Sequence, residues 1–369
     1  MVSGKSCKVI LVGTDPCNIR GGIGTAMQGY ARSLRGLGLL FRLVPSYSPV
    51  ARCGRWLLAV KAIPLVLRSI FQIRRSGGLP IHYGHTGSWP SMVREGFLAF
   101  LSRLCGARTL LQLHSPAVDA YLAHPIGRFL FRLAVLPAHA LGGLTPWWQS
   151  RLAGAGIGKP VVVIPNPLPL ELEAAALAAG GHNVSAAQRN DGIVTVLSMA
   201  RLVVGKGVET VIEAMQQLPE HVHLIVAGDG PLRADLERLA QEKGAADRVR
   251  FAGWVAAEGK AELLASVDIF CLPSRNDSFG MCFLEAMAHA VPVVALGWGP
   301  IRDVVPDGKA GILVEEASPD RVAGAIRRLL DADYRKVLGE GGRRWVLQEF
   351  SAEAVGRKFQ QALSRLFYV

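Results

Sequence analysis

The stretch Pro273–Asp303, which reads PSRNDSFGMCFLEAMAHAVPVVALGWGPIRD, decides the fold of this chain. The run Val267–Leu272 before it is short and apolar and is followed by a proline, a pattern that predicts a buried strand ending in a polar loop. From Gly280 the apolar residues return every three or four positions, as on one face of a helix, and Pro292–Leu296 is a second apolar run. We therefore predict a β–loop–α–β unit of a parallel sheet.

Two carboxylates of this unit are candidate ligands. Asp277 lies in the predicted loop and Glu285 lies just over one turn into the predicted helix, with seven residues between them, so both can face one crevice. Ligands of open parallel sheets bind at the C-terminal ends of the strands, where the first helical turn points its unpaired N–H groups outward. A carboxylate there is a poor partner for phosphate but accepts hydrogen bonds from two adjacent hydroxyls. The expected ligand group is therefore a diol of a sugar.

The same residues resemble a family signature. An acid, seven residues and a glutamate, with Phe279-Gly280 between them and Glu-Ala-Met-Ala followed by Pro-Val-Val-Ala, resemble the donor site of the retaining GT-B glycosyltransferases of family four, the glycosyl transferases group 1. The resemblance implies that Glu285 binds the ribose of a nucleotide sugar, while Asp277 and the backbone after Phe279-Gly280 bind the transferred sugar. The implied donor ligands in this stretch are Asp277, Phe279, Gly280, Met281, Cys282 and Glu285.

The stretch departs from the family pattern at three places. The first acid is usually glutamate and here is Asp277, the position of Ala290 is usually glycine, and Gly299-Pro300 is usually a pair of glycines. Asp277 and Pro300 favour, as an alternative, a non-catalytic carbohydrate- or lipid-binding protein on a decayed enzyme scaffold. A GT-B phosphorylase or a nucleotide-sugar epimerase is a second alternative.

Arg201 and Lys206 are candidate ligands of a diphosphate. They lie between a predicted strand, Ile193–Met199, and a predicted helix, Val208–Leu218. Arginine pairs with phosphate through a planar fork and lysine as a point charge. The run Arg-Leu…Lys-Gly resembles the pyrophosphate-binding loop of the same family, which implies that the two cations stabilise the leaving diphosphate without a metal. Asp331-Ala-Asp333 follows a helical stretch and not a strand, so we predict no metal site and no cofactor.

The first half of the chain alternates apolar runs with helical spacing, which is typical of a parallel α/β sheet. Strands are predicted at Lys8–Gly13, Leu40–Pro45, Ile81–His85, Thr109–His114 and Val161–Ile164.

Gly21, Gly22, His85 and His114 fall at the edge of this predicted sheet where ligands bind. The two glycines precede a predicted helix and let a ligand approach backbone amides, although a tight strand-to-helix turn explains them equally well. A lone histidine is more often structural than functional. However, Gln-Leu-His-Ser-Pro around His114 resembles the family strand whose histidine contacts the transferred sugar or the acceptor, and Gly21-Gly22 resembles the loop beside the donor phosphates. The resemblance implies that the catalytic residues are Asp277, His114, Arg201 and Lys206.

The charge of the chain is uneven. The net charge is +12, but Met1–Leu170 holds 19 Lys and Arg against three acids, a net of +16, and the remainder holds 22 against 26, a net of −4. Basic surfaces bind nucleic acid, anionic lipid or anionic substrates. Because the sequence has no zinc-finger pairs or stacked RNP aromatics, a membrane face or a phosphorylated lipid is the expected partner and nucleic acid is not.

Two basic, apolar stretches leave two interpretations open. Arg55–Arg75 combines Trp, Leu, Ile and Phe with five basic residues and no acid, which predicts a basic amphipathic helix, bent or broken near Pro64. It either binds lipid or packs in the core with its cations at the rim. Gly127–Leu136 leaves the same two alternatives.

We expect a cytoplasmic protein. No window approaches the roughly 18 uninterrupted apolar residues of a membrane span, and no apolar segment follows the basic start Met1–Lys8, so neither a span nor a signal peptide is predicted. The six cysteines are scattered without a Cys-x-x-Cys pair, so neither a zinc site nor a disulfide framework is predicted.

The resemblance implies a GT-B fold of two Rossmann-like domains facing across a cleft. The predicted domains are residues 1–168, which bind the acceptor, residues 192–350, which bind the nucleotide sugar, and residues 351–369, a C-terminal helix that crosses back to the first domain; the Ala- and Gly-rich residues 168–191 link the first two. The expected function is transfer of a hexosyl unit, with retention, to a glycan or polyprenyl-diphosphate-linked acceptor in bacterial surface polysaccharide biosynthesis. The expected location is the cytoplasm, peripheral to the cytosolic face of the inner membrane.

Overall fold

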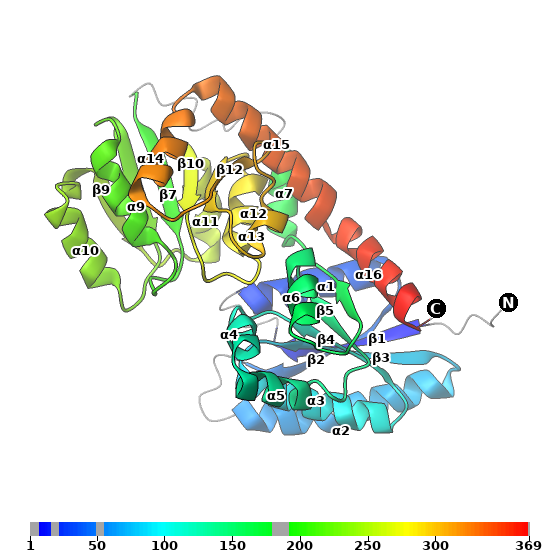
Figure 1. Cartoon of the computed structure of the whole chain (residues 1–369). Helices are drawn as coiled ribbons and strands as arrows, with labels where there is room; N and C mark the ends of the chain where they lie inside the picture. Colours follow the sequence, from blue (N-terminus) through cyan, green and yellow to red (C-terminus); the bar gives the residue numbers. More distant parts are fainter. Residues whose placement is uncertain (1–6, 16–21, 49–54, 179–191, 368–369) are drawn as a thin grey trace. The chain divides into compact units, whose positions relative to one another are not determined.

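A computed structural model describes residues 7–15, 22–48, 55–178 and 192–367 of the chain. The chain forms two compact units (Figure 1), one of Met1–Pro169 with Phe350–Val369 and one of Leu170–Glu349. Each unit is built on a six-stranded parallel sheet with helices packed against it. The predicted α/β class with parallel sheets is confirmed.

The sheet of the N-terminal unit has the strand order β2-β1-β3-β4-β5-β6. Its strands are β1 (Cys7–Thr14), β2 (Leu40–Tyr47), β3 (Leu79–Thr86), β4 (Arg108–Leu113), β5 (Ala140–Gly143) and β6 (Val161–Val163). Its helices are α1 (Gly22–Gly36), α2 (Arg55–Arg75), α3 (Trp89–Leu104), α4 (Ala117–Ala123), α5 (Pro125–Ala134), α6 (Pro146–Gly154) and, from the end of the chain, α16 (Ala352–Phe367). The five predicted strands are present, and β5 was missed.

Strand β5 could not be predicted from the sequence because it is short and half of its residues are glycine, which is depleted in strands. Its glycines are required by packing. A Cβ on Gly142 would lie 1.9 Å from Oε1 of Gln112, whose side chain on the neighbouring strand is hydrogen-bonded to Tyr83 and to the carbonyl of Ile164. The space beside Gly142 is therefore taken by the Gln112 side chain, and the strand lacks the β-branched pattern that a sequence search uses.

Both faces of this sheet are covered. On one face α1 and α16 pack over Val9, Leu11 and Tyr83, and on the other face α2 and α3 pack over Ile10 and Val12. The last helix, α16, begins as predicted with a serine cap, because Oγ of Ser351 accepts a hydrogen bond from the N–H of Ala354 at 3.2 Å.

Helix α2 runs unbroken across Pro64, so of the two predicted alternatives, a bend or a break, the break is wrong. Proline has no N–H to donate to the carbonyl of Val60, one turn earlier. Both residues lie on the exposed side of the helix, so water can reach this carbonyl. The helix therefore tolerates the proline.

The sheet of the C-terminal unit has the order β12-β11-β10-β7-β8-β9. Its strands are β7 (Val194–Met199), β8 (Val222–Ala227), β9 (Val249–Gly253), β10 (Ile269–Leu272), β11 (Val293–Leu296) and β12 (Gly311–Val314). Its helices are α7 (Leu170–Ala178), α9 (Val208–Ala214), α10 (Arg233–Glu242), α11 (Ala257–Ala265), α12 (Met281–Ala288), α13 (Ile301–Val304), α14 (Pro319–Arg328) and α15 (Ala332–Phe350), with 3-10 turns at Met215–Gln217 and Ala246–Arg248.

The predicted β–loop–α–β unit is β10, α12 and β11, and all residues of these two strands are buried. The predicted helix Val208–Leu218 divides into α9 and the turn Met215–Gln217. Part of the Ala-rich stretch taken as a link forms α7, which packs on α12 in the C-terminal unit. Residues 179–191 of that stretch lie outside the described residues.

Within the described part of the chain, no helix combines the length and the apolar composition needed to cross a bilayer.

Candidate functional site

The loop after β10 is shaped by a buried phenylalanine and a glycine with a left-handed backbone. Phe279 is 2 % exposed and anchors the loop in the core. Gly280 caps α12 with φ 78°, and a Cβ there would lie 2.4 Å from the ring of Phe283. Only glycine meets both conditions. The Phe-Gly pair of the predicted signature therefore fixes where the first turn of α12 begins.

Asp277 and Lys206, which were predicted separately, form an ion pair. Nζ of Lys206 lies 2.7 Å from Oδ1 of Asp277 and donates a second hydrogen bond to the carbonyl of Asn276 at 2.9 Å. Both side chains are only 14 % exposed, so the pair is largely shielded from water. The second oxygen, Oδ2 of Asp277, is buried and has no donor within the described ranges. A ligand hydroxyl can supply that missing donor.

The loops after β7 and β10 are bound to each other by their backbones. The N–H of Arg275 donates to the carbonyl of Gly205 at 2.9 Å, and Oγ of Ser274 donates to the same carbonyl at 3.3 Å. Gly207 has φ 76°, and a Cβ there would lie 2.6 Å from the carbonyl oxygen of Pro273. This close approach holds Lys206 beside Asp277.

The loop after β8 packs on the loop after β7. A Cβ on Gly228 would lie 1.8 Å from the carbonyl oxygen of Ala200, and one on Gly230 would lie 2.3 Å from that of Leu202. Arg201 lies between these two contacts and is exposed. Because β10, β7 and β8 are parallel neighbours, their C-terminal loops form one edge of the sheet, as the sequence predicted.

Glu285 is held by a residue that the sequence did not single out. Nζ of Lys260, on α11, lies 2.9 Å and 3.1 Å from the two carboxylate oxygens of Glu285 on α12. Glu285 is 9 % exposed. A lysine in an ordinary amphipathic helix carries no signal by itself. It could have been found only by knowing that α11 and α12 are neighbours.

Met281 and Cys282 begin α12 beside this site and are partly buried. Burial, and then the carboxylate of Asp277, raises the pKa of the Cys282 thiol. The group therefore stays a thiol at neutral pH. It is a poor nucleophile, because the thiolate is the reactive form.

In the N-terminal unit, His85 and His114 are brought together at the ends of β3 and β4. Nδ1 of His85 lies 2.7 Å from Nε2 of His114, and the two rings stack with their centroids 4.9 Å apart. Tyr30 of α1 packs on His85. The sequence placed both histidines at strand ends but did not predict their contact, although β3 and β4 being adjacent would have indicated it. Gly22 begins α1, while Gly21 lies outside the described residues.

Burial keeps these histidines neutral. It lowers the pKa of His114 to about 3 and, with the neighbouring His114 and His82, lowers the pKa of His85 well below its ordinary value. A neutral imidazole has one donor and one acceptor nitrogen, so in this contact one ring donates its N–H to the unprotonated nitrogen of the other. The pair can position a ligand by hydrogen bonding and cannot supply positive charge.

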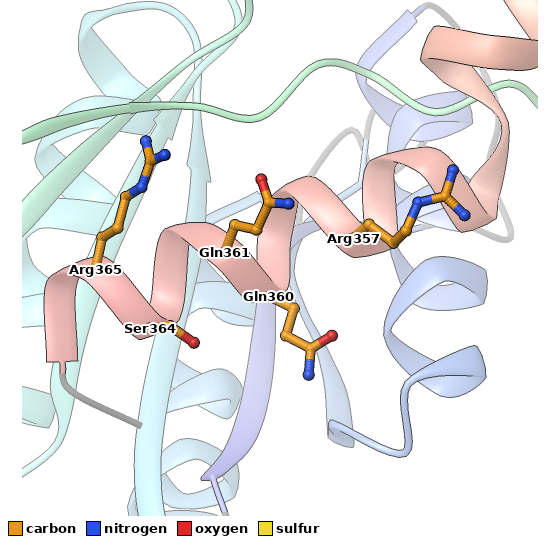
Figure 2. Close-up of a pocket in the computed structure, with 5 residues that line it drawn as sticks. All are labelled: Arg357, Gln360, Gln361, Ser364 and Arg365. Atoms are coloured by element: carbon orange, nitrogen blue, oxygen red, sulfur yellow. The ribbon is translucent and has the colours of Figure 1, made fainter.

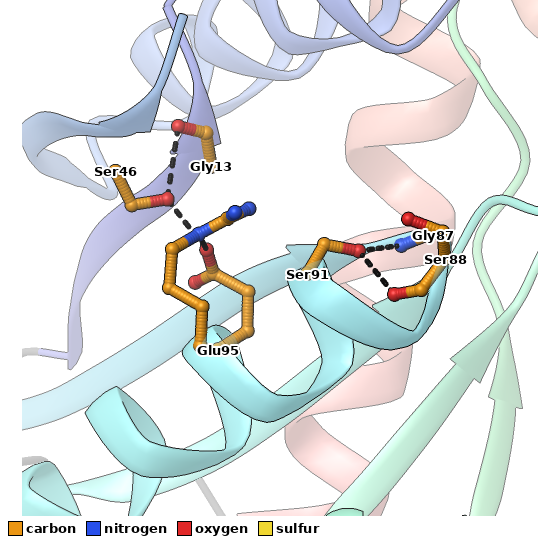
Figure 3. A network of polar contacts seen from close by, with 7 residues as sticks. Gly13, Ser46, Gly87, Ser88, Ser91 and Glu95 are labelled. Carbon is orange, nitrogen blue, oxygen red and sulfur yellow. Dashed lines mark hydrogen bonds and ion pairs between the residues drawn. The ribbon is translucent and has the colours of Figure 1, made fainter. Parts of the chain in front are cut away.

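The N-terminal unit also contains a buried carboxylate that the sequence did not predict (Figure 3). Glu95 of α3 is fully buried, accepts a hydrogen bond from Oγ of Ser46 and pairs with Nε of Arg94 at 3.0 Å. The Ser46 hydroxyl also contacts the carbonyl of Gly13. Burial raises the pKa of Glu95. These contacts bind α3 to the ends of β1 and β2, a structural role.

A shallow hollow of about 470 Å³ lies on α16 and contains none of the predicted site residues (Figure 2). It is lined by Arg357, Gln360, Gln361, Ser364 and Arg365. All five residues belong to one helix, so the hollow follows the spacing of side chains on its outer face.

Solved structures share this fold over nearly the whole chain. Sucrose-phosphate synthase from Thermosynechococcus elongatus aligns with a TM-score of 0.72 and 22 % identity, covering 98 % of this chain and 99 % of that one. Anabaena HepE in complex with UDP-glucose aligns with a TM-score of 0.73 and 18 % identity, covering 97 % and 99 %. Two α/β units, each with a parallel six-stranded sheet, thus define the fold of a GT-B glycosyltransferase.

Sequence comparison finds a family match for the C-terminal part of the chain. Residues 184–345 match the family model of glycosyl transferases group 1. A GDP-mannose-dependent alpha-(1-6)-phosphatidylinositol monomannoside mannosyltransferase of Mycobacterium tuberculosis is 34 % identical over 180 residues, which are 46 % of this chain and 47 % of that protein. The lipopolysaccharide core biosynthesis glycosyltransferase LpsE of Rhizobium meliloti is 36 % identical over 170 residues, 46 % of this chain and 49 % of that one.

The domain at residues 184–345 of this chain is similar to the glycosyl transferases group 1 family. The matched segments span about half the length of these curated relatives.

Proposed function

We propose that the protein transfers a hexosyl unit from a nucleotide-diphospho-sugar to a glycan or lipid-linked glycan, with retention of configuration. One observation carries the proposal. Lys206 and Asp277 meet at the C-terminal edge of the sheet within the group 1 domain, and the second carboxylate oxygen of Asp277 lacks a donor within the described residues. The cation suits a phosphate, and the acceptor without a donor suits a hydroxyl group of the sugar that the phosphate carries.

Each residue then has a role in donor binding. Lys206 and Arg201 bind the diphosphate, Asp277 accepts a hydrogen bond from the sugar, and Glu285 accepts those of the ribose hydroxyls. The amides at the start of α12, from Gly280 to Cys282, face the same ligand. Two solved structures of this fold are named as complexes with UDP or UDP-glucose, which supports a nucleotide sugar as the donor.

The proposed mechanism uses no protein nucleophile and no metal. Cys282 is kept as a thiol, and the Asp277 carboxylate is already paired with Lys206. The diphosphate would leave from the same face that the acceptor attacks, and one of its oxygens would take the proton of the acceptor hydroxyl. The fixed charge of Lys206 and Arg201 stabilises the negative charge that grows on the leaving group. His114 is proposed to contact the transferred sugar or the acceptor.

We propose a polyprenyl-diphosphate-linked glycan at the cytosolic face of the inner membrane as the acceptor, in bacterial surface polysaccharide assembly. The +16 net charge of residues 1–170 supports an anionic acceptor or lipid surface. The names of two relatives refer to a phosphatidylinositol mannoside and to lipopolysaccharide core biosynthesis, which agrees with an acceptor attached to lipid.

The test is slow hydrolysis of a panel of UDP-, GDP- and ADP-sugars without acceptor. We expect one donor to be hydrolysed, and Glu285→Ala and Lys206→Ala to reduce the rate by at least about tenfold, because each loses a charge-assisted hydrogen bond. Glu237→Ala and Lys243→Ala, which break surface ion pairs of the same unit, are the controls and should hydrolyse at the native rate. If no donor is hydrolysed and no nucleotide binds, the non-catalytic binding protein becomes the better account.

A further inference from the structure

The solvent-facing side of α3 is apolar where a soluble helix would be polar. Val93, Phe97, Phe100 and Leu104 follow one another at intervals of four, three and four residues, so they form one stripe. Their exposed fractions lie between 46 % and 69 %. The opposite side of the helix packs normally on the sheet through residues such as Leu98. Helix α3 is therefore apolar on both sides.

Helix α5 repeats this feature beside α3. Ile126, Phe129, Leu130 and Leu133 are 44–75 % exposed, while Phe131 faces inward and is fully buried. Helices α2, α3 and α5 lie side by side along one face of the N-terminal unit, with α3 in the middle in contact with both others (Figure 1). The two stripes therefore belong to one layer of helices. We call them together the apolar face.

The C-terminal unit also exposes apolar side chains, such as Leu177, Trp254 and Val337, but these lie on separate segments. Its helix α14 exposes Asp320, Arg321, Arg327 and Arg328 and buries its apolar residues, as expected for a helix in water. Exposed apolar side chains gathered on neighbouring helices mark a surface that binds a partner or a membrane.

The charges around the apolar face identify its partner. Helices α2, α3 and α5 contain a single acid, Glu95, and it is fully buried. On α2, Lys61, Arg68 and Arg75 are exposed and recur every seven residues, so they lie along one line of the helix. The layer thus presents cations and apolar groups to solvent and no exposed carboxylate.

This combination fits an anionic lipid leaflet better than a second copy of the chain. Acyl chains accept the apolar groups, while anionic headgroups pair with lysine and arginine at the border of the layer. In a symmetric dimer the same surface meets itself, so the cations of one copy would lie against those of the other without an acid between them.

We propose that the outer side of α2, α3 and α5 is a bilayer-docking surface. The Phe and Leu side chains of α3 and α5 insert into a leaflet rich in anionic lipid, and the cations of α2 contact its headgroups. This extends the membrane location proposed above and rests on that part of the proposed function alone. The sequence pointed to α2 and to the stretch that forms α5, and the structure adds α3; α2 itself also exposes Leu57, Val60 and Phe71.

The test is co-sedimentation of the full chain with vesicles of phosphatidylcholine alone and of phosphatidylcholine mixed equally with phosphatidylglycerol. Phe97→Ser with Phe100→Ser and Phe129→Ser should lower binding to the mixed vesicles at least about tenfold, because three apolar groups no longer insert. Lys61→Gln with Arg68→Gln and Arg75→Gln should lower it by about fivefold per charge, and only on the anionic vesicles. Val337→Ser with Leu177→Ser, which are exposed in the C-terminal unit, should bind as the native chain does.

The apolar variant should unfold at the native temperature, since its three side chains are exposed. Native binding by this variant, or no binding by the native chain, would overturn the proposal. A native dimer in light scattering that the apolar variant converts to monomer would also overturn it, in favour of a second copy. Nucleotide titration of the same samples distinguishes this proposal from the proposed donor binding. A variant that no longer binds vesicles should still bind nucleotide with native affinity.

Discussion

At the scale of single residues, the contacts of Asp277 suit the proposed role of this residue in donor binding. One carboxylate oxygen is paired with Lys206 and the other is buried without a donor in the described part of the chain. An unsatisfied buried acceptor costs roughly 1–3 kcal/mol, which a ligand hydroxyl recovers on binding. Aspartate stands here where the resembled family pattern has glutamate, and it is compatible with the proposed donor site because Lys206 contacts it directly.

Lys260 is a positioning residue for Glu285, since its ammonium group contacts both carboxylate oxygens. We expect Lys260→Met to weaken nucleotide binding by about tenfold, because the carboxylate is no longer held in one orientation. Lys260→Arg should recover part of this affinity. The measurement is the dissociation constant of the nucleotide together with KM and kcat for donor hydrolysis. A purely structural lysine would lower the thermal stability and leave the affinity of the folded fraction native.

At the scale of elements, the start of α12 depends on Gly280. Gly280→Ala should destabilise the C-terminal unit by about 1–3 kcal/mol and reduce nucleotide binding, because alanine is strained at φ 78° and its Cβ would collide with Phe283. Gly324→Ala on α14 is the matched control, since no atom lies within 4 Å of its added Cβ. That control should keep or raise stability. Denaturant unfolding of both variants measures the difference, and equal stabilities would contradict the account.

The end of the same helix carries strain that a glycine would remove. Ala290 has φ 57°, and the N–H of Val291 donates to the carbonyl of Ala286, as in a helix terminus that favours glycine. Ala290→Gly should therefore raise the free energy of unfolding by about 1 kcal/mol. It should leave donor hydrolysis unchanged. A loss of stability in urea unfolding would show that alanine is not strained there.

The elements around the site could be predicted because their signals are local. The buried strands, the Phe279-Gly280 turn and the cations before α9 each occupy a short run of sequence. The contacts of Lys260 with Glu285 and of His85 with His114 could not be predicted in this way, since they join residues on separate elements. The α3 stripe of the apolar face was missed for the same reason. A stripe such as Val93–Leu104 has the same helical period whether it faces the core or the solvent.

At the scale of the whole molecule, buried histidines make the N-terminal unit sensitive to acid. His82, His85 and His114 of the N-terminal unit are buried, and burial lowers the pKa of His82 to about 4 and that of His114 to about 3. The unfolded chain binds protons at these groups near pH 6.5 and the folded chain does not. The stability that these neutral histidines contribute to the N-terminal unit is therefore fully present above pH 6.5, and it is lost as the pH falls toward about 4.

We expect each of these histidines to remove about 1.4 kcal/mol of stability per pH unit below 6.5. Urea unfolding at pH 7.5 and 5.0, with hydrogen exchange of β3 and β4 as the local probe, measures the loss. His114→Gln keeps an amide nitrogen near the position of Nε2. It should lower the loss of unfolding free energy by about 1.4 kcal/mol per pH unit, the contribution of one histidine. An N-terminal unit equally stable at both pH values would contradict buried, neutral histidines.

In the proposed function, the C-terminal unit binds a nucleoside diphosphate through Lys206. Isothermal titration of the full chain with UDP and GDP, and with the matching monophosphates, in the presence of EDTA tests it most directly. We expect one diphosphate to bind and its monophosphate to bind at least about tenfold more weakly. Lys206→Ala should remove most of this difference, while Lys243→Ala should not. Absence of diphosphate binding, or native affinity in Lys206→Ala, would show that Lys206 does not bind a diphosphate.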